Sequence, residues 1–461
     1  MDSILAISLF VLLALPISLL LRPIADSFLL SPAVAFCIGI FAAGLTLAFD
    51  VSLLATYPVV AMTLGFGFLG SARCRKQIMS NARTPIGSFD LIFVSLLLVF
   101  GIGFLVHLPP PLAWDARSIW LFHASWLSHG ETVFSTAQTL DSLSFSHPSY
   151  PFGGPAAIAI VWLLSGTQES LWLGVRVVAF LALTNTIFAT KLLLAPFAQK
   201  AQTLGLTLLA ATITALMFLS VDGNALSGYM DVLLATNLAI AFAALLTLQD
   251  NHNQRIDSHQ KVLLVIAALA IFASVGIKQE GLFFSLVLIV SFAIVYVRKW
   301  PQVAALLVSA VASFAIWKVG IAATGGKSES DASGILSNFP ELLDLNSVAW
   351  SNFSVIWNGY FKSYLIYPNL IFLVSVLALL IEPNSRRALR VMTFAVVAWI
   401  GNWVVTFAPY MLGESRKNLG WWLDTSFNRI VSTQMVFTLI FCGFVLARAF
   451  TLNIERKNKI G

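Results

Sequence analysis

The chain of 461 residues is 58% hydrophobic and only 10% charged, and it contains 36 Phe and 13 Trp. This composition excludes a soluble globular protein and predicts an integral membrane protein of the all-α class. The formal net charge of +6 does not indicate nucleic-acid binding, because the basic residues form short clusters between apolar runs, as the positive-inside rule requires. The three cysteines lie far apart and predict neither a disulfide framework nor a metal cluster.

Apolar runs long enough to cross a bilayer predict about thirteen transmembrane helices. They cover residues 4–21, 29–49, 51–70, 89–107, 169–191, 202–220, 230–248, 262–277, 281–297, 302–322, 364–381, 391–408 and 430–447. The run 155–165 is too short to span the bilayer comfortably, so we interpret it as a re-entrant or interfacial helix. We divide the chain into N-terminal extra helices (1–87), a core (88–300) and a C-terminal part (301–461).

Alternating the predicted helices across the membrane places the basic clusters on one side, which we predict to be the cytoplasmic side of the cell inner membrane. The N-terminus is then outside and the C-terminus is cytoplasmic. The clusters are formed by Arg22, Arg73, Arg75, Lys76, Arg83, Lys191, Lys200, Arg255, Lys261, Arg298, Lys299, Arg386, Arg387, Arg390 and the basic tail. The main polar segments all lie on the other, outer side: 107–154, 222–231, 278–280, 323–362 and 409–429.

The first outer segment, 107–154, holds the densest group of ionisable residues. Its histidines, carboxylates and arginine are His107, His123, His129, His147, Asp115, Glu131, Asp141 and Arg117. Residues 115–129 are rich in Trp and Phe and predict a helix that lies at headgroup level. Asp115, beside Trp114, is a candidate general base, because a carboxylate at the edge of the hydrocarbon is partly desolvated. It is equally suited to cap the helix that follows it.

Three later motifs also carry charge close to predicted spans. Lys278 and Glu280 lie in a short polar turn between two apolar runs, where ionisable residues are either functional or paired at the interface. Asp231 starts the next predicted helix and is expected to cap it or to support a site. The last outer loop contains Arg416 and Arg429. Basic residues on the outer side of the membrane are contrary to the positive-inside rule. Their presence there therefore indicates binding of an anionic phosphate or of anionic lipid headgroups.

The histidines do not form a recognisable metal motif. The spacing of His123, His129 and His147 matches no compact zinc pattern. We therefore expect no cofactor. A divalent metal held together with Asp115 is the less favoured alternative.

The order of these motifs resembles the GT-C superfamily of polytopic glycosyltransferases. The resemblance rests on WDARSIW (from Trp114), HPSYP (from His147), GYMD (from Gly228), KQEG (from Lys278) and WLDTSFNR (from Trp422). It is closest to the transferases that use dolichyl- or polyprenyl-phosphate sugars, in the branch of protein O-mannosyltransferases and lipid A aminoarabinose transferases. The chain departs from that pattern at Ser149 and Gln279, and the first outer loop lacks an acidic pair separated by one residue, which argues against an oligosaccharyltransferase.

The resemblance implies a hexosyl or pentosyl transferase that moves a sugar from a polyprenyl-phosphate carrier to a lipid, glycan or protein acceptor, with inversion. The acidic residue of the first outer loop is the functional hallmark of this family, and Asp115 is the position that matches. The expected phosphate-binding residues are Arg429, Arg416, Lys278 and His147. The expected sugar- or acceptor-binding residues are Glu280, Asp231, Tyr150, Trp114 and Arg117.

Two other classes of protein stay open at this point. In a transporter or lipid flippase, Lys278, Glu280 and Asp231 would line an ion or substrate path. In a non-catalytic assembly subunit, Asp115 would be a helix cap only. A transfer assay with lipid-linked sugars separates the first reading from both alternatives.

Overall fold

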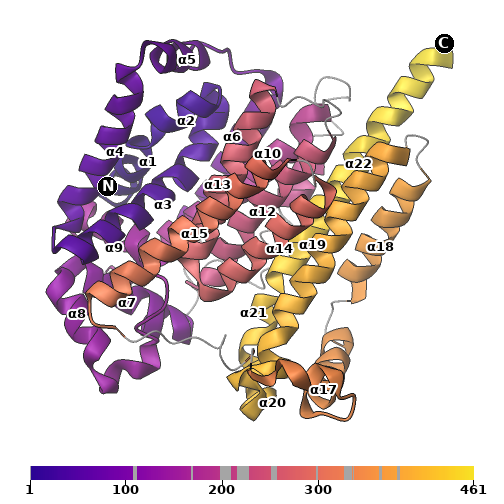
Figure 1. Ribbon diagram of the computed structural model, residues 1–461. Coiled ribbons are helices and arrows are strands. Elements are labelled where there is room, and N and C mark those ends of the chain that lie inside the picture. Colours follow the sequence, from indigo (N-terminus) through magenta and orange to yellow (C-terminus); the bar gives the residue numbers. More distant parts are fainter. Residues whose placement is uncertain are drawn as a thin grey trace.

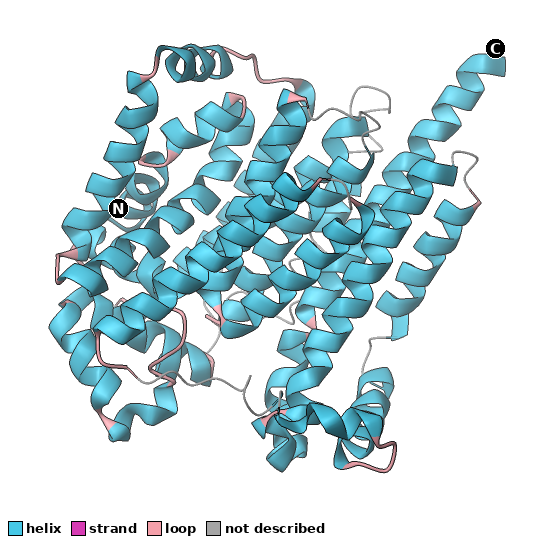
Figure 2. Ribbon diagram, in the orientation of Figure 1, coloured by secondary structure: helices cyan, strands magenta, loops and turns pink. Residues whose placement is uncertain are grey.

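The computed structural model describes residues 2–106, 112–167, 170–197, 209–214, 228–250, 257–296, 299–326, 335, 337–362, 366–381 and 385–460. Every regular element among these residues is helical (Figure 2). The predicted all-α class is therefore confirmed for the described part of the chain.

The helices fall into three groups along the chain. The N-terminal helices are α1 (Asp2–Leu12), α2 (Leu15–Leu21), α3 (Ile24–Phe49), α4 (Leu53–Gly70), α5 (Ala72–Ala82) and α6 (Ser88–Val106). The middle group comprises η1 (Ala116–Trp120), α7 (Leu121–His129), α8 (Glu131–Thr139), η2 (Asp141–Ser146), α9 (Gly153–Ser165), α10 (Leu171–Leu194), η3 (Ala195–Phe197), α12 (Met230–Asp250), α13 (Ser258–Ile277), α14 (Gln279–Val295) and α15 (Trp300–Ala323). The C-terminal group comprises η5 (Phe339–Leu343), α17 (Val348–Lys362), α18 (Ile366–Leu380), α19 (Ser385–Leu412), η6 (Glu414–Asn418), α20 (Leu419–Trp422), η7 (Leu423–Phe427), α21 (Asn428–Ile430) and α22 (Ser432–Ile460).

Among the described residues, fewer helices are long enough to span a membrane than the thirteen that the sequence predicts. Eight described helices are long and apolar enough to cross a membrane, namely α3, α4, α10, α12, α13, α15, α19 and α22. A ninth span results if α1 and α2, which are bent by 48° at a short break, are counted together. Two other predicted spans correspond to apolar helices of 17 and 15 residues, α14 and α18, which are slightly short of a full crossing. The predicted span 89–107 corresponds to α6, whose described side chains are mostly apolar, and most of 202–220 lies outside the described residues.

The centre of the bundle is formed by α10 and α12, which pack against each other and are buried almost completely. A helix that is apolar on all sides has no preferred solvent face, so it is stable in the middle of a bundle rather than at its edge. α13 packs on α12, and α3 packs on α10, α13 and α15. Around this centre, α18, α19 and α22 form one flank, and the N-terminal helices form the other (Figure 1).

The short helices gather at one end of the bundle. Figure 1 shows α7, α8, α17 and α20 at this end, whereas α5 and the C-terminus lie at the opposite end. The sequence predicts the same grouping of 107–154, 323–362 and 409–429 on one side. Which end of the bundle faces the outer side of the membrane remains a prediction. We call the end that carries α7, α8, α17 and α20 the loop end.

The segment at 115–165 differs in detail from the sequence prediction. Residues 116–129 are helical, as η1 and α7, but Trp120 and Trp126 are buried in the core instead of lying at headgroup level. The 155–165 run is the short helix α9, buried against α1, α3, α7 and α10. The aromatic side chains of this region therefore anchor it to the bundle, and α9 is packed inside the bundle on most of its surface.

We predict that Gly281 is required for the α13 to α14 junction. A Cβ atom at Gly281 would lie 2.0 Å from the backbone oxygen of Ser274, which cannot move without displacing α13. Gly281→Ala should lower the free energy of unfolding by about 1–3 kcal/mol, as overpacking does in other cores. Thermal unfolding of purified protein in detergent measures this. Gly67→Ala is the matched control, because a Cβ at Gly67 meets no atom within 4 Å; equal losses in both variants would contradict the prediction.

Candidate functional site

Five charged side chains from four separate parts of the sequence meet near the loop end of the bundle. Ion pairs connect them into one network, which consists of Asp115, Asp231, Lys278, Glu280 and Arg429. All five are candidate site residues from the sequence. Their convergence places the WDARSIW, GYMD, KQEG and WLDTSFNR motifs around one point.

Arg429, on the short helix α21, connects two carboxylates. Its Nη1 lies 2.5 Å from Oδ2 of Asp115 and 3.6 Å from Oδ2 of Asp231. The guanidinium also lies over the ring of Tyr229, with the Cζ atom 4.1 Å from the ring centroid. A planar cation that stacks on an aromatic ring and pairs with carboxylates keeps a fixed orientation.

Lys278 pairs with the carboxylate oxygen of Asp231 that does not face Arg429. Its Nζ lies 2.8 Å from Oδ1 of Asp231 and 3.8 Å from Oε1 of Glu280. The lysine is buried, so it does not snorkel to the membrane surface as one sequence interpretation allowed. Burial lowers the pKa of Lys278, but the charges of Asp231 and Glu280 outweigh this effect and leave the pKa above its ordinary value. Lys278 is therefore a permanent cation.

Local backbone features bring the elements close enough for these contacts. Gly228 has a φ of +85°, and a Cβ atom there would lie 2.8 Å from the Cβ of Ala116. Its lack of a side chain lets the start of α12 approach the helix that follows Asp115. In addition, a π-helical turn directly follows Asp115 (η1), and another ends one residue before α21, which carries Arg429 (η7). Such turns are rare and are frequent at functional sites.

The structure does not support the interpretation of Asp115 as a helix cap. Asp115 occupies the position before η1, but its side chain makes no capping hydrogen bond. The carboxylate accepts a hydrogen bond from Arg429 instead. Asp231 likewise directs its carboxylate to Lys278 and Arg429, so it supports the network.

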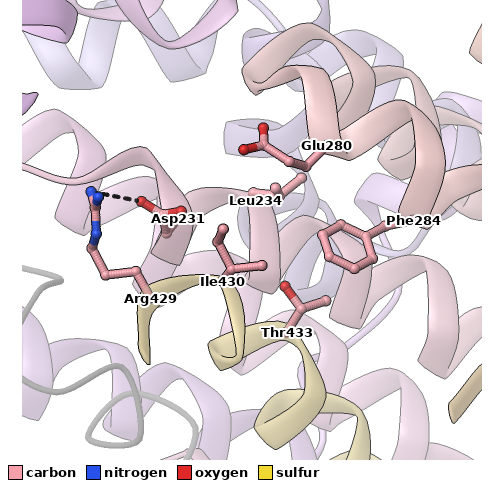
Figure 3. A pocket seen from close by; sticks show the side chains of 7 residues that line it. All are labelled: Asp231, Leu234, Glu280, Phe284, Arg429, Ile430 and Thr433. Atoms are coloured by element: carbon pink, nitrogen blue, oxygen red, sulfur yellow. Dashed lines mark ion pairs between the residues drawn. The ribbon is translucent and has the colours of Figure 1, made fainter. Parts of the chain in front are cut away.

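A shallow hollow adjoins the network (Figure 3). Asp231, Glu280 and Arg429 supply its charged wall, and the remaining lining residues are Leu234, Phe284, Ile430 and Thr433. Side chains fill this hollow almost completely, so a ligand that reaches Arg429 must displace part of the ion network.

Tyr150 and His147 approach the network through Trp120. The His147 ring stacks on Tyr150, with centroids 4.7 Å apart, and Tyr150 lies 5.7 Å from Trp120. Lys278 Nζ lies 6.0 Å from the same Trp120 ring. The HPSYP segment is fixed to the bundle because Trp317 donates a hydrogen bond to the Ser149 carbonyl oxygen and Gln138 donates one to that of Pro148.

Three predicted site residues lie apart from the network. Arg416 pairs with Glu341 at 2.7 Å, in the group of short helices formed by η5 and η6. Trp114 is half exposed and its ring lies 6.4 Å from that of Phe145. Arg117 is exposed. The sequence does not mark Tyr229 and Trp120 as site residues, yet both rings lie near network cations and both occur inside the motifs that carry the resemblance.

Within the described residues, no group of three or more His, Cys, Asp or Glu side chains could hold a metal ion. His107 lies outside the described residues. His123 is completely buried and stacks on Trp126 at 4.7 Å, and His129 Nδ1 donates a hydrogen bond to the Ser125 carbonyl oxygen. His123 is thus a core residue.

The fold and hydropathy define a polytopic, all-helical membrane protein. No protein-family model matches the chain, and neither the curated proteins nor the solved structures show a significant match to it. The resemblance to GT-C enzymes therefore rests on the motifs alone, and the activity is a matter for proposal.

We predict that protonation of His123 destabilises the fold. Burial is the main reason that the pKa of His123 falls from 6.5 to about 3, and neither ring nitrogen makes a hydrogen bond of normal geometry. The folded state therefore binds fewer protons than the unfolded state below pH 6.5. Its stability is complete above that pH and decreases as the pH falls toward 3, by up to about 1.4 kcal/mol per pH unit.

The measurement is the melting temperature of purified protein between about pH 7.5 and about pH 4, a range that starts above the ordinary pKa of histidine and extends about 2.5 units below it. His123→Phe should flatten part of the decline seen in the wild type. His129→Phe, at an exposed position of the same helix, is the control and should leave the decline unchanged. A parallel decline in all three proteins would show that other groups cause it.

Proposed function

We propose that this protein is a membrane glycosyltransferase that moves a sugar from a polyprenyl-phosphate carrier to a hydroxyl group of a lipid, glycan or protein acceptor. One observation carries the proposal: Asp115 and Arg429, which are 314 positions apart in the sequence, form a direct ion pair. The sequence independently suggested the first residue as a base and the second as a phosphate ligand.

The reaction needs these two functions close together. A sugar phosphate ester already has a good leaving group, so the protein must hold the phosphate as negative charge develops on it. A carboxylate must accept the proton of the attacking hydroxyl. The guanidinium of Arg429 offers paired donors in one plane, which match phosphate oxygens.

The pairing also suggests how the two functions are coupled. A donor phosphate competes with Asp115 for Arg429, because both are anions that use the same guanidinium. When the phosphate takes Arg429, the carboxylate of Asp115 is released and becomes available to the acceptor hydroxyl. The acceptor oxygen then bonds to the anomeric carbon, the bond to the phosphate oxygen breaks, and the proton passes to Asp115. A single displacement of this kind inverts the anomeric centre.

The other network residues have supporting roles in this scheme. Asp231 keeps Arg429 and Lys278 in place, and Lys278 adds positive charge next to the leaving group. Glu280, which lines the hollow and is more exposed than Asp231, is suited to accept hydrogen bonds from sugar hydroxyls. Tyr150 and His147 form an aromatic surface beside Trp120, and Trp114 and Arg117 extend the site toward the acceptor. No metal is required for these steps, and the outer face of the cytoplasmic membrane is the proposed location.

Transport is the second candidate, and one observation favours it. A further ionic group joins three helices, with Lys191 lying 2.5 Å from Asp26 and 2.7 Å from Asp90. Transporters often place paired charges on both sides of a substrate path. Uptake of a labelled substrate into vesicles, without any transfer of label to an acceptor, would favour this candidate.

We predict that Asp115→Asn abolishes transfer while the protein stays folded. Removing a general base lowers turnover by about 100-fold or more. The assay measures movement of labelled sugar from polyprenyl-phosphate donors to membrane lipid or glycan extracts by the purified protein. Asp141→Asn, an exposed carboxylate of the same segment, is the matched control and should transfer normally. Near-normal turnover of Asp115→Asn would exclude Asp115 as the base.

We predict that Arg429→Gln weakens donor binding by about tenfold or more, as expected when one charged hydrogen-bonding partner is lost. Arg416→Gln should have a much smaller effect, because Arg416 pairs with Glu341 outside the network. Equilibrium binding of a polyprenyl-phosphate sugar to each variant measures this. If donor affinity is the same in wild type and Arg429→Gln, Arg429 is not the phosphate ligand; if Arg416→Gln is the weaker binder, the phosphate lies elsewhere.

A further inference from the structure

Helix α5 connects two apolar helices at the end of the bundle opposite the loop end (Figure 1). The span α4 ends at Gly70, and α5 begins two residues later, at Ala72. After α5, the mostly apolar helix α6 begins at Ser88. Since the chain enters α5 from one apolar helix and leaves it toward another, α5 lies close to a surface of the membrane.

Exposed apolar side chains on both neighbouring helices define the level of α5 more closely. Phe66, near the end of α4, is 67% exposed, and Leu91, in the first turn of α6, is 53% exposed. Large apolar side chains that a membrane-spanning bundle leaves uncovered face the hydrocarbon of the bilayer. Gly70 lies only about 6 Å along the helix from Phe66. The charged helix that follows Gly70 is therefore at the level of the lipid headgroups.

One face of α5 holds the helix against the bundle. Ile78 and Asn81 are buried, and Asn81 Nδ2 donates a hydrogen bond of 2.7 Å to the Leu19 carbonyl oxygen on α2. Ser71 caps the start of α5, because its hydroxyl oxygen accepts a hydrogen bond from the Cys74 amide. The position of α5 is thus set by residues that carry no charge.

The rest of the α5 surface has a positive charge that the chain does not neutralise. Its exposed basic residues, which we call the α5 cations, are Arg73, Arg75, Lys76 and Arg83. Residues 51–89 contain no carboxylate at all. Asp90, which follows them, pairs with Lys191. The ion pairs within the described part of the chain all use cations other than these four.

We propose that α5 binds the headgroups of anionic phospholipids. A helix that packs on the bundle through one face and carries four cations on the remaining surface attracts negatively charged headgroups at the level where it lies. The acyl chains of the same lipids contact the exposed apolar side chains of α4 and α6. This binding is independent of the proposed transferase reaction, because α5 and the ion network are at opposite ends of the bundle (Figure 1).

The test uses the full chain, purified in a neutral detergent. Dioctanoyl phosphatidylglycerol, dioctanoyl phosphatidylcholine and a polyglutamate peptide are titrated separately, and the bound molecules are counted by native mass spectrometry. Arg75→Gln with Lys76→Gln should weaken phosphatidylglycerol binding about 25-fold, because each basic residue near a lipid surface contributes about fivefold to the affinity. Binding of phosphatidylcholine should not change. The matched control is Lys261→Gln with Arg386→Gln, which removes the same charge from exposed positions at the starts of α13 and α19.

A loss of phosphatidylglycerol binding that is confined to the α5 variant supports the proposal. Equal binding by wild type and the α5 variant, or an equal loss in the control, overturns it. Tighter binding of polyglutamate than of phosphatidylglycerol also overturns it, and indicates an acidic protein as the partner. Arg75→Lys with Lys76→Arg keeps both charges and should retain binding. If this variant binds as weakly as the glutamine variant, the charge of α5 is not the cause and the proposal is wrong.

Discussion

The buried carboxylate of Asp231 is the interaction on which the loop end of this protein depends. Only 4% of Asp231 is exposed, and an isolated charge at such a position costs several kcal/mol. Lys278 and Arg429 compensate this charge from two directions, and Arg429 in turn holds Asp115. The start of α12, the α13 to α14 junction, α21 and the segment before η1 are thus positioned relative to one another by a single anion and its partners.

The buried cations of the described residues are neutralised by carboxylates. At the loop end, each network cation has at least one carboxylate partner, so the network is stable as it stands and an incoming anion must compete for Arg429. Lys191, which pairs with Asp26 and Asp90, is neutralised in the same way.

Much of the candidate site could be predicted from the sequence, because charged residues are costly next to long apolar runs and so stand out. This pattern indicates five residues that the structure brings together: Asp115, Asp231, Lys278, Glu280 and Arg429. The same pattern indicates Arg416, yet Arg416 pairs with Glu341 elsewhere. Charge and position along the chain do not indicate which partner a side chain will find. Tyr229 and Trp120 were missed because an aromatic residue is unremarkable in a chain with so many of them.

The sequence by itself determined that this is a helical membrane protein and which motifs concentrate its charge, since both follow from composition and local pattern. Tertiary structure decided which apolar helices lie at the centre of the bundle, because α10 and α12 are buried on all sides whereas α4 and α15 are largely exposed. It also decided that Trp120 and Trp126 are buried instead of interfacial, and that Asp115 pairs with Arg429 instead of capping a helix. These outcomes depend on contacts between residues far apart in the chain, and a local pattern contains no information about such contacts.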